Sequence, residues 1–161
     1  MALFSAHLMA ATAELGSVAP NFKLKNQKGQ EFDLAARKGQ WTVLYFYPKS
    51  ETPGCTKQAC AFRDRISKIR KMGAEVYGIS INSVEDQKKF HKHHHLNFDL
   101  LADAEETVTN LYGAKMPDRA MANRWTFLLD PELKIRAIDK NVDPVQDPER
   151  VATKLKELQG K

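Results

Sequence analysis

Continuous apolar runs and alternating apolar positions divide the chain into short predicted strands. Residues 41–47 (WTVLYFY) form an uninterrupted run rich in β-branched and aromatic residues. Such a run is typical of a strand that is buried on both faces inside an α/β sheet. Residues 21–34 instead alternate around Lys28-Gly29, which predicts a β-hairpin. Further strands are expected at residues 74–80, 98–103, 124–130 and 133–139.

Between these strands, apolar residues recur at helical spacing. Residues 55–72 carry apolar side chains separated by charged ones, which predicts an amphipathic helix. Ser83 is expected to begin a second helix, because a serine can cap a helix and acidic residues follow it. A short helix is expected at 104–112, and Asp147-Pro148 predicts the start of the last one, with proline in its first turn.

The order β-β-β-α-β-α-β-α-β-β-α predicts a single α/β sandwich. Its sheet must be mixed, because the turn at 130–132 joins the last two strands into an antiparallel hairpin. No repeat, low-complexity tract or linker interrupts the sequence. We therefore expect one domain over residues 16–161. Residues 1–15 are expected to be an N-terminal extension, either a short helix or a degenerate signal segment.

Charge and hydropathy exclude several functional classes. The 161 residues carry a net charge of +5, with 25 Lys+Arg spread along the chain against 20 Asp+Glu. Nucleic-acid binding would require a basic stripe or a recognisable motif, and the sequence has neither. No run approaches the ~20 apolar residues of a membrane helix. We therefore expect neither a nucleic-acid partner nor a membrane association.

The first residues bear on the compartment. Ala11-Thr12-Ala13 fits an A-x-A cleavage pattern, but the segment lacks a positive n-region, and Ser5 and His7 break its apolar run. A cytoplasmic protein is therefore expected, with a periplasmic location as the alternative if residues 1–13 are an export signal.

Both cysteines lie at one predicted strand–helix junction. Cys55 and Cys60 are too few for a disulfide-dense secreted scaffold, so we interpret them as a working pair. Catalytic groups of α/β proteins gather at the carboxyl ends of the strands. The N-terminus of the following helix supplies free N–H groups and a partial positive charge, which favour a thiolate. Pro53 needs no N–H at that position, and Gly54 allows close approach of a substrate, so both are expected to line the substrate site.

The segment 45–64 (YFYPKSETPGCTKQACAFRD) resembles the active-site segment of peroxiredoxins. It is most similar to the bacterioferritin comigratory protein or PrxQ branch, which has a second cysteine five residues on. The resemblance runs from about Gly16 through VAPNF, VYGIS, LLAD and NRWTFLLD. Its signature is Pro-x-x-x-Thr-x-x-Cys with a distant arginine before the late strand. It implies a thioredoxin-like fold: a central mixed sheet flanked by helices, with an N-terminal hairpin.

The resemblance also implies a role for each site residue. Cys55 would be the peroxidatic cysteine and Cys60 the resolving one. Thr52 would hydrogen-bond the peroxide and the thiolate, and Pro48 would shield the sulfur from water. Arg124 would polarise the peroxide, since a fixed cation stabilises charge that develops on the departing oxygen. Arg119 is the weaker candidate for that role, because no strand follows it directly.

The implied reaction is an atypical two-cysteine peroxidase cycle. Hydrogen peroxide and small organic hydroperoxides would be the substrates, and thioredoxin or a similar dithiol the reductant. No metal, flavin or haem is implied, because sulfur carries the chemistry. A monomer is expected, with a dimer as the alternative.

The spacing of the two cysteines predicts a conformational change. Residues five apart in an intact helix have Cα atoms about 8.7 Å apart. A disulfide requires less than about 7 Å. The helix start at residues 55–60 is therefore expected to unwind after Cys55 becomes a sulfenic acid, so that Cys60 can attack it.

Two other functions compete with the peroxidase interpretation. A thioredoxin-type disulfide oxidoreductase is disfavoured, because the spacing is C-x4-C and Arg124 would have no task. A metal-binding or holdase module would use the histidine cluster, in which His91 and His95 are expected to share a helix face. No Cys, Asp or Glu stands at a convincing spacing beside that cluster, so its histidines, which also include His93 and His94, are expected to be exposed and without a role.

Overall fold

The computed structural model describes residues 13–161, so most of the expected N-terminal extension lies outside the described residues. Within this range the elements follow the expected order, with one added 3-10 helix. Their bounds are β1 (Lys23–Asn26), β2 (Glu31–Asp33), η1 (Leu34–Arg37), β3 (Trp41–Phe46), α1 (Pro53–Lys71), β4 (Ala74–Ser80), α2 (Val84–His93), β5 (Asp99–Ala102), α3 (Thr107–Leu111), β6 (Trp125–Leu129), β7 (Ile135–Asp139) and α4 (Asp147–Leu158).

The strands form one mixed sheet in the order β2-β1-β5-β4-β3-β6-β7. Strands β3, β4 and β5 are parallel, while β1–β2, β1–β5, β3–β6 and β6–β7 pair antiparallel. Both hairpins expected from the turn residues are confirmed. The mixed sheet follows because the parallel strands are connected through helices and the hairpins are not.

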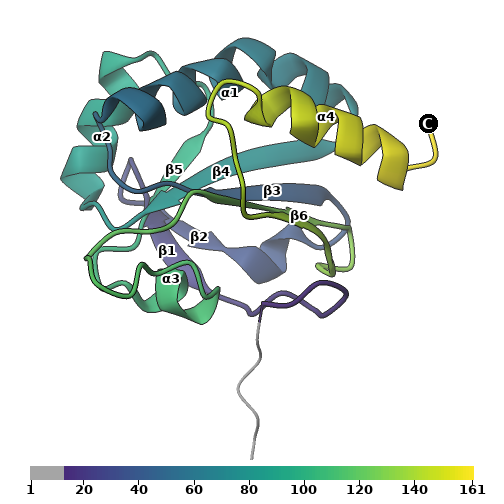
Figure 1. Cartoon of the computed structure of the whole chain (residues 1–161), viewed down its shortest axis with the longest axis horizontal. Helices are drawn as coiled ribbons and strands as arrows, with labels where there is room; N and C mark the ends of the chain where they lie inside the picture. Colours follow the sequence, from purple (N-terminus) through teal and green to yellow (C-terminus); the bar gives the residue numbers. More distant parts are fainter. Residues whose placement is uncertain (1–12) are drawn as a thin grey trace, which may run out of the picture.

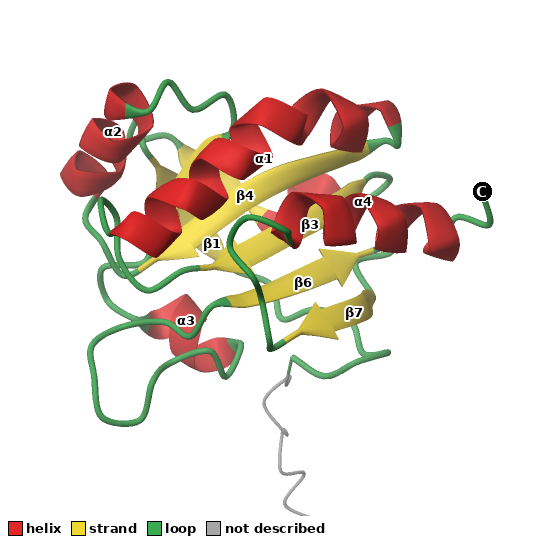
Figure 2. Cartoon of the chain, turned by 45° about the horizontal axis from the view of Figure 1, so that its top comes forward, coloured by secondary structure: helices red, strands yellow, loops and turns green. Residues whose placement is uncertain are grey.

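Helices cover both faces of the sheet (Figures 1 and 2). Helices α1, α2 and α4 lie over one face, and α3 lies over the other. Strand β3 supplies side chains to both layers: Val43 and Tyr45 belong to the core under α1, and Leu44 and Phe46 to the core on the opposite face. This two-sided burial is what the continuous apolar run predicted.

Some helix ends differ from the expected ones. Helix α1 begins at Pro53, two residues earlier, because proline is well accommodated in the first turn. Helix α3 begins only at Thr107, since Glu106 before it adopts a left-handed φ of 63°. Helix α2 ends at His93, and His95 has a φ of 51°, so the chain has left the helix by that residue.

The topology brings two distant segments together at one edge of the sheet. Because β6 runs antiparallel to β3, its first residue, Trp125, pairs with the last residue of β3, Phe46. Arg124, just before β6, therefore lies at the edge where the chain turns from β3 into α1. None of the helices described is long and apolar enough to cross a membrane.

Candidate active site

Cys55 lies in the first turn of α1 with only 1% of its surface exposed. Thr52 precedes the helix in an extended conformation, and its carbonyl accepts a hydrogen bond from the Thr56 N–H at 2.9 Å. Pro53 occupies the first helical position, as expected from its missing N–H. The sulfur belongs to the core cluster formed with Tyr45 and Tyr47 from β3 and its C-terminal end. A thiol near the positive end of a helix is thereby largely removed from water.

The Arg124 side chain reaches this sulfur from the start of β6. Its Nη2 lies 3.5 Å from Cys55 Sγ, and its Nη1 donates to Gln58 Oε1 at 2.7 Å. The competing Arg119 is exposed on the preceding loop. Of the two candidate arginines, Arg124 is therefore the one that the fold brings to the cysteine.

Gly54 gives the guanidinium its space. A Cβ placed on Gly54 would lie 3.0 Å from Arg124 Nη2, closer than most Cβ contacts in proteins. Gly54 was expected to allow the close approach of a substrate, and the group that lies close to it in the structure is the Arg124 side chain. The position of Gly54 beside a substrate stays a prediction.

A buried hydrogen-bond chain holds Arg124 from behind. Gln58, which accepts from Arg124, donates through Nε2 to Asp147 Oδ2 at 2.8 Å, and Thr126 Oγ1 donates to the same oxygen at 2.8 Å. The amide of Gln58 is therefore fixed with its oxygen toward Arg124. Burial raises the pKa of the Asp147 carboxyl to about 6, although the hydrogen bonds from Thr126 and Gln58 act in the lowering direction.

Sequence reasoning missed both Gln58 and Asp147. Gln58 carried a usable signal, because it follows Cys55 by three residues and so shares its helix face. Asp147 carried none, since an acidic residue at the start of a helix is ordinary. Its partnership with Gln58 exists only because α4 packs beside α1 (Figure 2).

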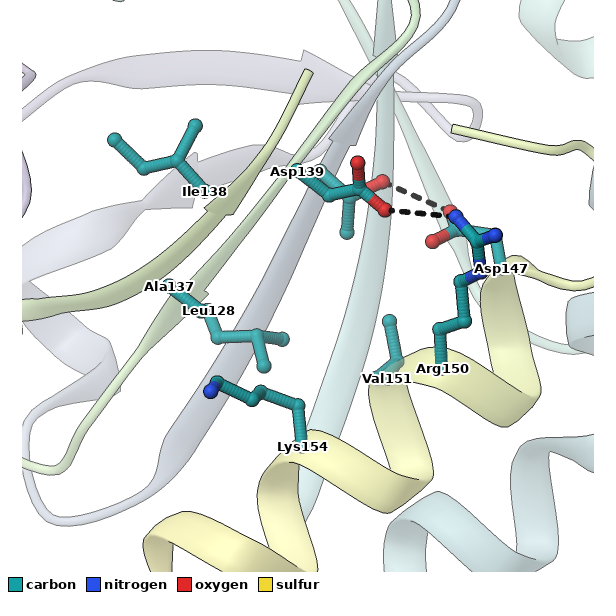
Figure 3. Close-up of a pocket in the computed structure, with 9 residues that line it drawn as sticks. Leu128, Ala137, Ile138, Asp139, Asp147, Arg150, Val151 and Lys154 are labelled. Atoms are coloured by element: carbon teal, nitrogen blue, oxygen red, sulfur yellow. Dashed lines mark hydrogen bonds and ion pairs between the residues drawn. The ribbon is translucent and has the colours of Figure 1, made fainter. Parts of the chain in front are cut away.

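Asp147 also borders a cavity of about 240 Å³ behind this chain of hydrogen bonds. The cavity lies between strands β6 and β7 and helix α4, and its lining includes an ion pair between Arg150 Nη1 and Asp139 Oδ2 at 3.6 Å (Figure 3). Arg124 and Cys55 do not line it.

The segment between β3 and α1 is held by buried polar contacts. Ser50 Oγ donates to Gln87 Oε1 at 2.9 Å, and the Ser50 N–H donates to Asn82 Oδ1 at 3.0 Å. The Tyr47 hydroxyl also donates to Gln87, and this tyrosine is buried, which fits the core packing favoured for it. Gln87 of α2 therefore fixes the segment that leads into the cysteine.

Two further predicted residues lie on this segment. The Thr52 hydroxyl donates to the Lys49 carbonyl at 2.7 Å, so its lone pairs remain able to accept. Pro48 is half-buried and lines a small hollow together with Ala120 and Met121. The loop at 114–123, which had no assigned role, thus reaches the neighbourhood of Pro48. The shielding by Pro48 and the peroxide contact of Thr52 stay predictions.

Both cysteines are free thiols, and Cys60 is half-buried in the same helix. Helix α1 is continuous over Pro53–Lys71 and contains both. At this spacing the two Cα atoms are too far apart for a disulfide, as calculated from helix geometry. The unwinding that would bring them together stays a prediction.

The structure changes the picture of the histidine cluster. The expectation that His91 and His95 share a helix face is wrong, because α2 ends at His93. Instead, His93 and His94 converge on Glu51, which lies more than forty residues earlier in the sequence. Among the described residues, these three are the group of side chains that could hold a metal ion. The acidic partner that seemed to be missing is supplied by the loop before Cys55.

Comparisons with known proteins bear on this site. The model of the AhpC/TSA family matches residues 15–138. A chloroplastic peroxiredoxin Q of Triticum aestivum is 40% identical over 157 residues, covering 97% of this chain and 71% of the wheat protein. A peroxiredoxin bcp of Coxiella burnetii is 40% identical over 131 residues, covering 78% of this chain and 87% of the bacterial protein.

A solved structure is similar as well. It is that of the bacterioferritin comigratory protein of Xanthomonas campestris, described through trapped intermediate and ligand complexes of its alkyl peroxide reduction. The two chains superpose with a TM-score of 0.80 at 29% identity, covering 85% of this chain and 91% of that one. The expected thioredoxin-like fold is thereby confirmed.

Proposed function

This chain belongs to the AhpC/TSA family, in its peroxiredoxin Q and bacterioferritin comigratory protein branch, and we propose that Cys55 is the thiol with which it reduces peroxides. The activity is that of a thiol-dependent peroxidase. The observation that carries the assignment is the contact between the Cys55 sulfur and the Arg124 guanidinium at 3.5 Å, in the first turn of a helix. A disulfide oxidoreductase of the thioredoxin type would leave this arginine without a function.

In the first step the Cys55 thiolate attacks one oxygen of the peroxide. The S–O bond forms as the O–O bond breaks, so the sulfur is oxidised to a sulfenic acid and the peroxide is reduced. The departing oxygen takes up a proton and leaves as water or an alcohol. Arg124 stabilises the negative charge on that oxygen as it develops, and Gln58 holds the guanidinium in place.

In the second step Cys60 resolves the sulfenic acid. Its thiol attacks the Cys55 sulfur, a disulfide forms, and water leaves. Helix α1 must first unwind over its first two turns, because the intact helix keeps the two Cα atoms too far apart. Two electrons from a thioredoxin-like dithiol then return both cysteines to thiols by exchange.

The proposal extends to the substrates, the reductant and the compartment. Small peroxides, both hydrogen peroxide and organic hydroperoxides, are the substrates, with Pro53, Gly54 and Thr52 beside them. The chain works as a monomer with its dithiol reductant, and we place it in the cytoplasm. The wheat relative is chloroplastic by name, so this compartment is not common to all the relatives.

Peroxide consumption with a dithiol reductant tests the function. The wild-type chain should consume hydrogen peroxide catalytically, whereas Cys55→Ser should be inactive. Cys60→Ser should still oxidise Cys55 to the sulfenic acid but should form no disulfide. Catalytic turnover by Cys55→Ser would overturn the assignment of this cysteine.

A further inference from the structure

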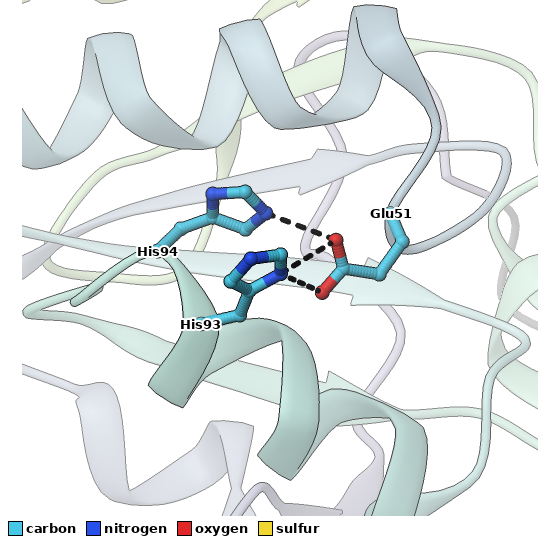
Figure 4. A group of neighbouring side chains, drawn as sticks. All are labelled: Glu51, His93 and His94. Carbon is cyan, nitrogen blue, oxygen red and sulfur yellow. Dashed lines mark hydrogen bonds and ion pairs between the residues drawn. The ribbon is translucent and has the colours of Figure 1, made fainter.

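Three potential metal ligands meet at the junction of the active-site loop and α2. The Glu51 carboxylate lies 3.1 and 3.2 Å from His93 Nδ1, and 3.0 Å from His94 Nε2 (Figure 4). The three ligand atoms all lie within 4.8 Å of one another. This arrangement is separate from the peroxide-reducing thiol and is not used by the reaction proposed above.

The spacing of these atoms fits a tetrahedral ion. Zinc takes imidazole nitrogens and carboxylate oxygens at about 2.0–2.2 Å, so neighbouring ligand atoms of a tetrahedral site lie about 3.3 Å apart. The carboxylate–imidazole distances of 3.0–3.2 Å are close to this value. The third pair of ligand atoms, His93 Nδ1 and His94 Nε2, lies within 4.8 Å.

Neighbouring contacts hold two of the ligands in position. The His94 ring packs edge-on against the buried Phe90 at 5.3 Å, and the His94 carbonyl accepts from Arg63 Nη1 at 2.7 Å. Glu51 follows the anchored Ser50 and adopts a left-handed φ of 67°, a conformation that is uncommon for glutamate. The loop is thus held in a conformation from which the Glu51 carboxylate reaches the histidines.

The donor set selects the kind of ion. Two imidazoles with one carboxylate suit borderline transition ions such as Zn²⁺, whereas Ca²⁺ and Mg²⁺ prefer oxygen ligands alone. The His93 side chain is 69% exposed, so an ion can enter from solvent and can keep an open coordination position. We propose that Glu51, His93 and His94 form a binding site for one divalent transition-metal ion, with Zn²⁺ as its probe.

The position of the site has a consequence that rests on the proposed function. Glu51 directly precedes Thr52, the residue from which α1 starts, while the histidines belong to the end of α2. A bound ion would fasten the start of α1 to α2. Since the Cys55–Cys60 disulfide requires α1 to unwind there, the ion should bind the reduced form more tightly than the disulfide form. By linkage, it should disfavour disulfide formation by the same factor.

Calorimetric titration with Zn²⁺ at neutral pH tests the site. The titration uses the full chain carrying Cys55→Ser and Cys60→Ser, so that thiolates cannot bind the ion. We expect one ion per chain, with affinity at least ~10-fold weaker after Glu51→Gln or His94→Gln. His91→Gln is the matched control, because His91 is on α2 but outside the group, and its affinity should be unchanged.

The histidine tautomers give a second, independent readout. In the zinc-bound chain, ¹⁵N spectra of the imidazoles should show the metal on Nδ1 of His93 and on Nε2 of His94. Absence of saturable binding, or binding that Glu51→Gln leaves unchanged, would overturn the site and leave an imidazole–carboxylate ion pair only. Binding lost in His91→Gln would equally contradict it.

The redox consequence is tested on the oxidised wild-type chain, which has no free thiol. Its affinity for Zn²⁺ should be lower than that of the serine variant. Equal affinities would overturn the coupling while leaving the site intact. Failure of the wild-type chain to form the disulfide, seen by intact mass, would instead count against the proposed peroxidase cycle.

Discussion

Arg124 and Cys55 are joined across 69 residues of sequence by a contact of 3.5 Å between Nη2 and Sγ. The contact depends on the antiparallel pairing of β6 with β3, which places the start of one strand beside the end of the other. Gln58 holds the second nitrogen of the same guanidinium. The arginine is thus held in position by the protein alone, which supports the charge-stabilising role proposed for it.

Replacing Arg124 should slow the oxidation of Cys55. Loss of one preorganised donor to a developing negative charge typically costs ~10²–10³ in rate, so Arg124→Met should lose about that much. Arg124→Lys keeps the charge but cannot contact the sulfur and Gln58 together. Its oxidation rate should therefore lie between those of the wild-type chain and Arg124→Met. Stopped-flow measurement of sulfenic acid formation checks this. Arg119→Met, on the exposed loop, is the control, and an equal loss there would contradict the assignment.

Gly54→Ala should displace the same guanidinium without unfolding the protein. The added Cβ would lie 3.0 Å from Nη2 of Arg124, so the side chain has to move. We expect a loss of ~10-fold in the oxidation rate, because small misplacements of a catalytic group are costly. The midpoint of thermal unfolding should be unchanged or raised, since alanine has a higher helix propensity than glycine.

A double-mutant cycle isolates the cause of that loss. In the Arg124→Met background, Gly54→Ala should cost much less than in the wild-type chain, because the group it displaces is gone, and any small loss that remains reports its place beside the substrate. An additional ~10-fold loss in that background would show that Gly54 acts on the substrate directly.

Asp147 should make stability depend on pH. Its pKa is raised to about 6 by burial, so between about pH 4 and pH 6 the folded chain binds a proton that the unfolded chain has released. Stability from this group should therefore fall as pH rises through that window, by roughly 3 kcal/mol at most. Asp147→Asn mimics the protonated acid. The unfolding free energy of Asp147→Asn minus that of the wild-type chain should rise from pH 4 to pH 6 and then level off. A difference that stays constant over this range would contradict the raised pKa of Asp147.

Much of the fold could be predicted from the sequence. The apolar run at 41–47 indicated the central strand, because a strand buried on both faces is apolar at every position. The helical spacing in 55–72 indicated the first helix, because a helix buried on one face is apolar at every third or fourth position. Turn residues indicated both hairpins. The end of α2 at His93 could not be predicted, since its polar sequence continues without a helix breaker.

Candidate site residues could be named from the sequence only where one local segment carries them, and their roles stay predictions. Cys55, Thr52 and Pro53 lie within four residues of one another, and the resemblance added Arg124. Contacts made by tertiary packing left no such signal: Asp147 reaches Gln58 because α4 lies beside α1. Glu51 meets His93 and His94 because the loop before α1 passes the end of α2.

In the proposed function, Cys55 and Cys60 complete one redox cycle. A rapid-quench thiol count, after mixing the reduced chain with one equivalent of hydrogen peroxide, tests it most directly when combined with intact mass. We expect both thiols to disappear together and the mass to fall by two hydrogens. Survival of both thiols, or a stable gain of one oxygen without a disulfide, would contradict it.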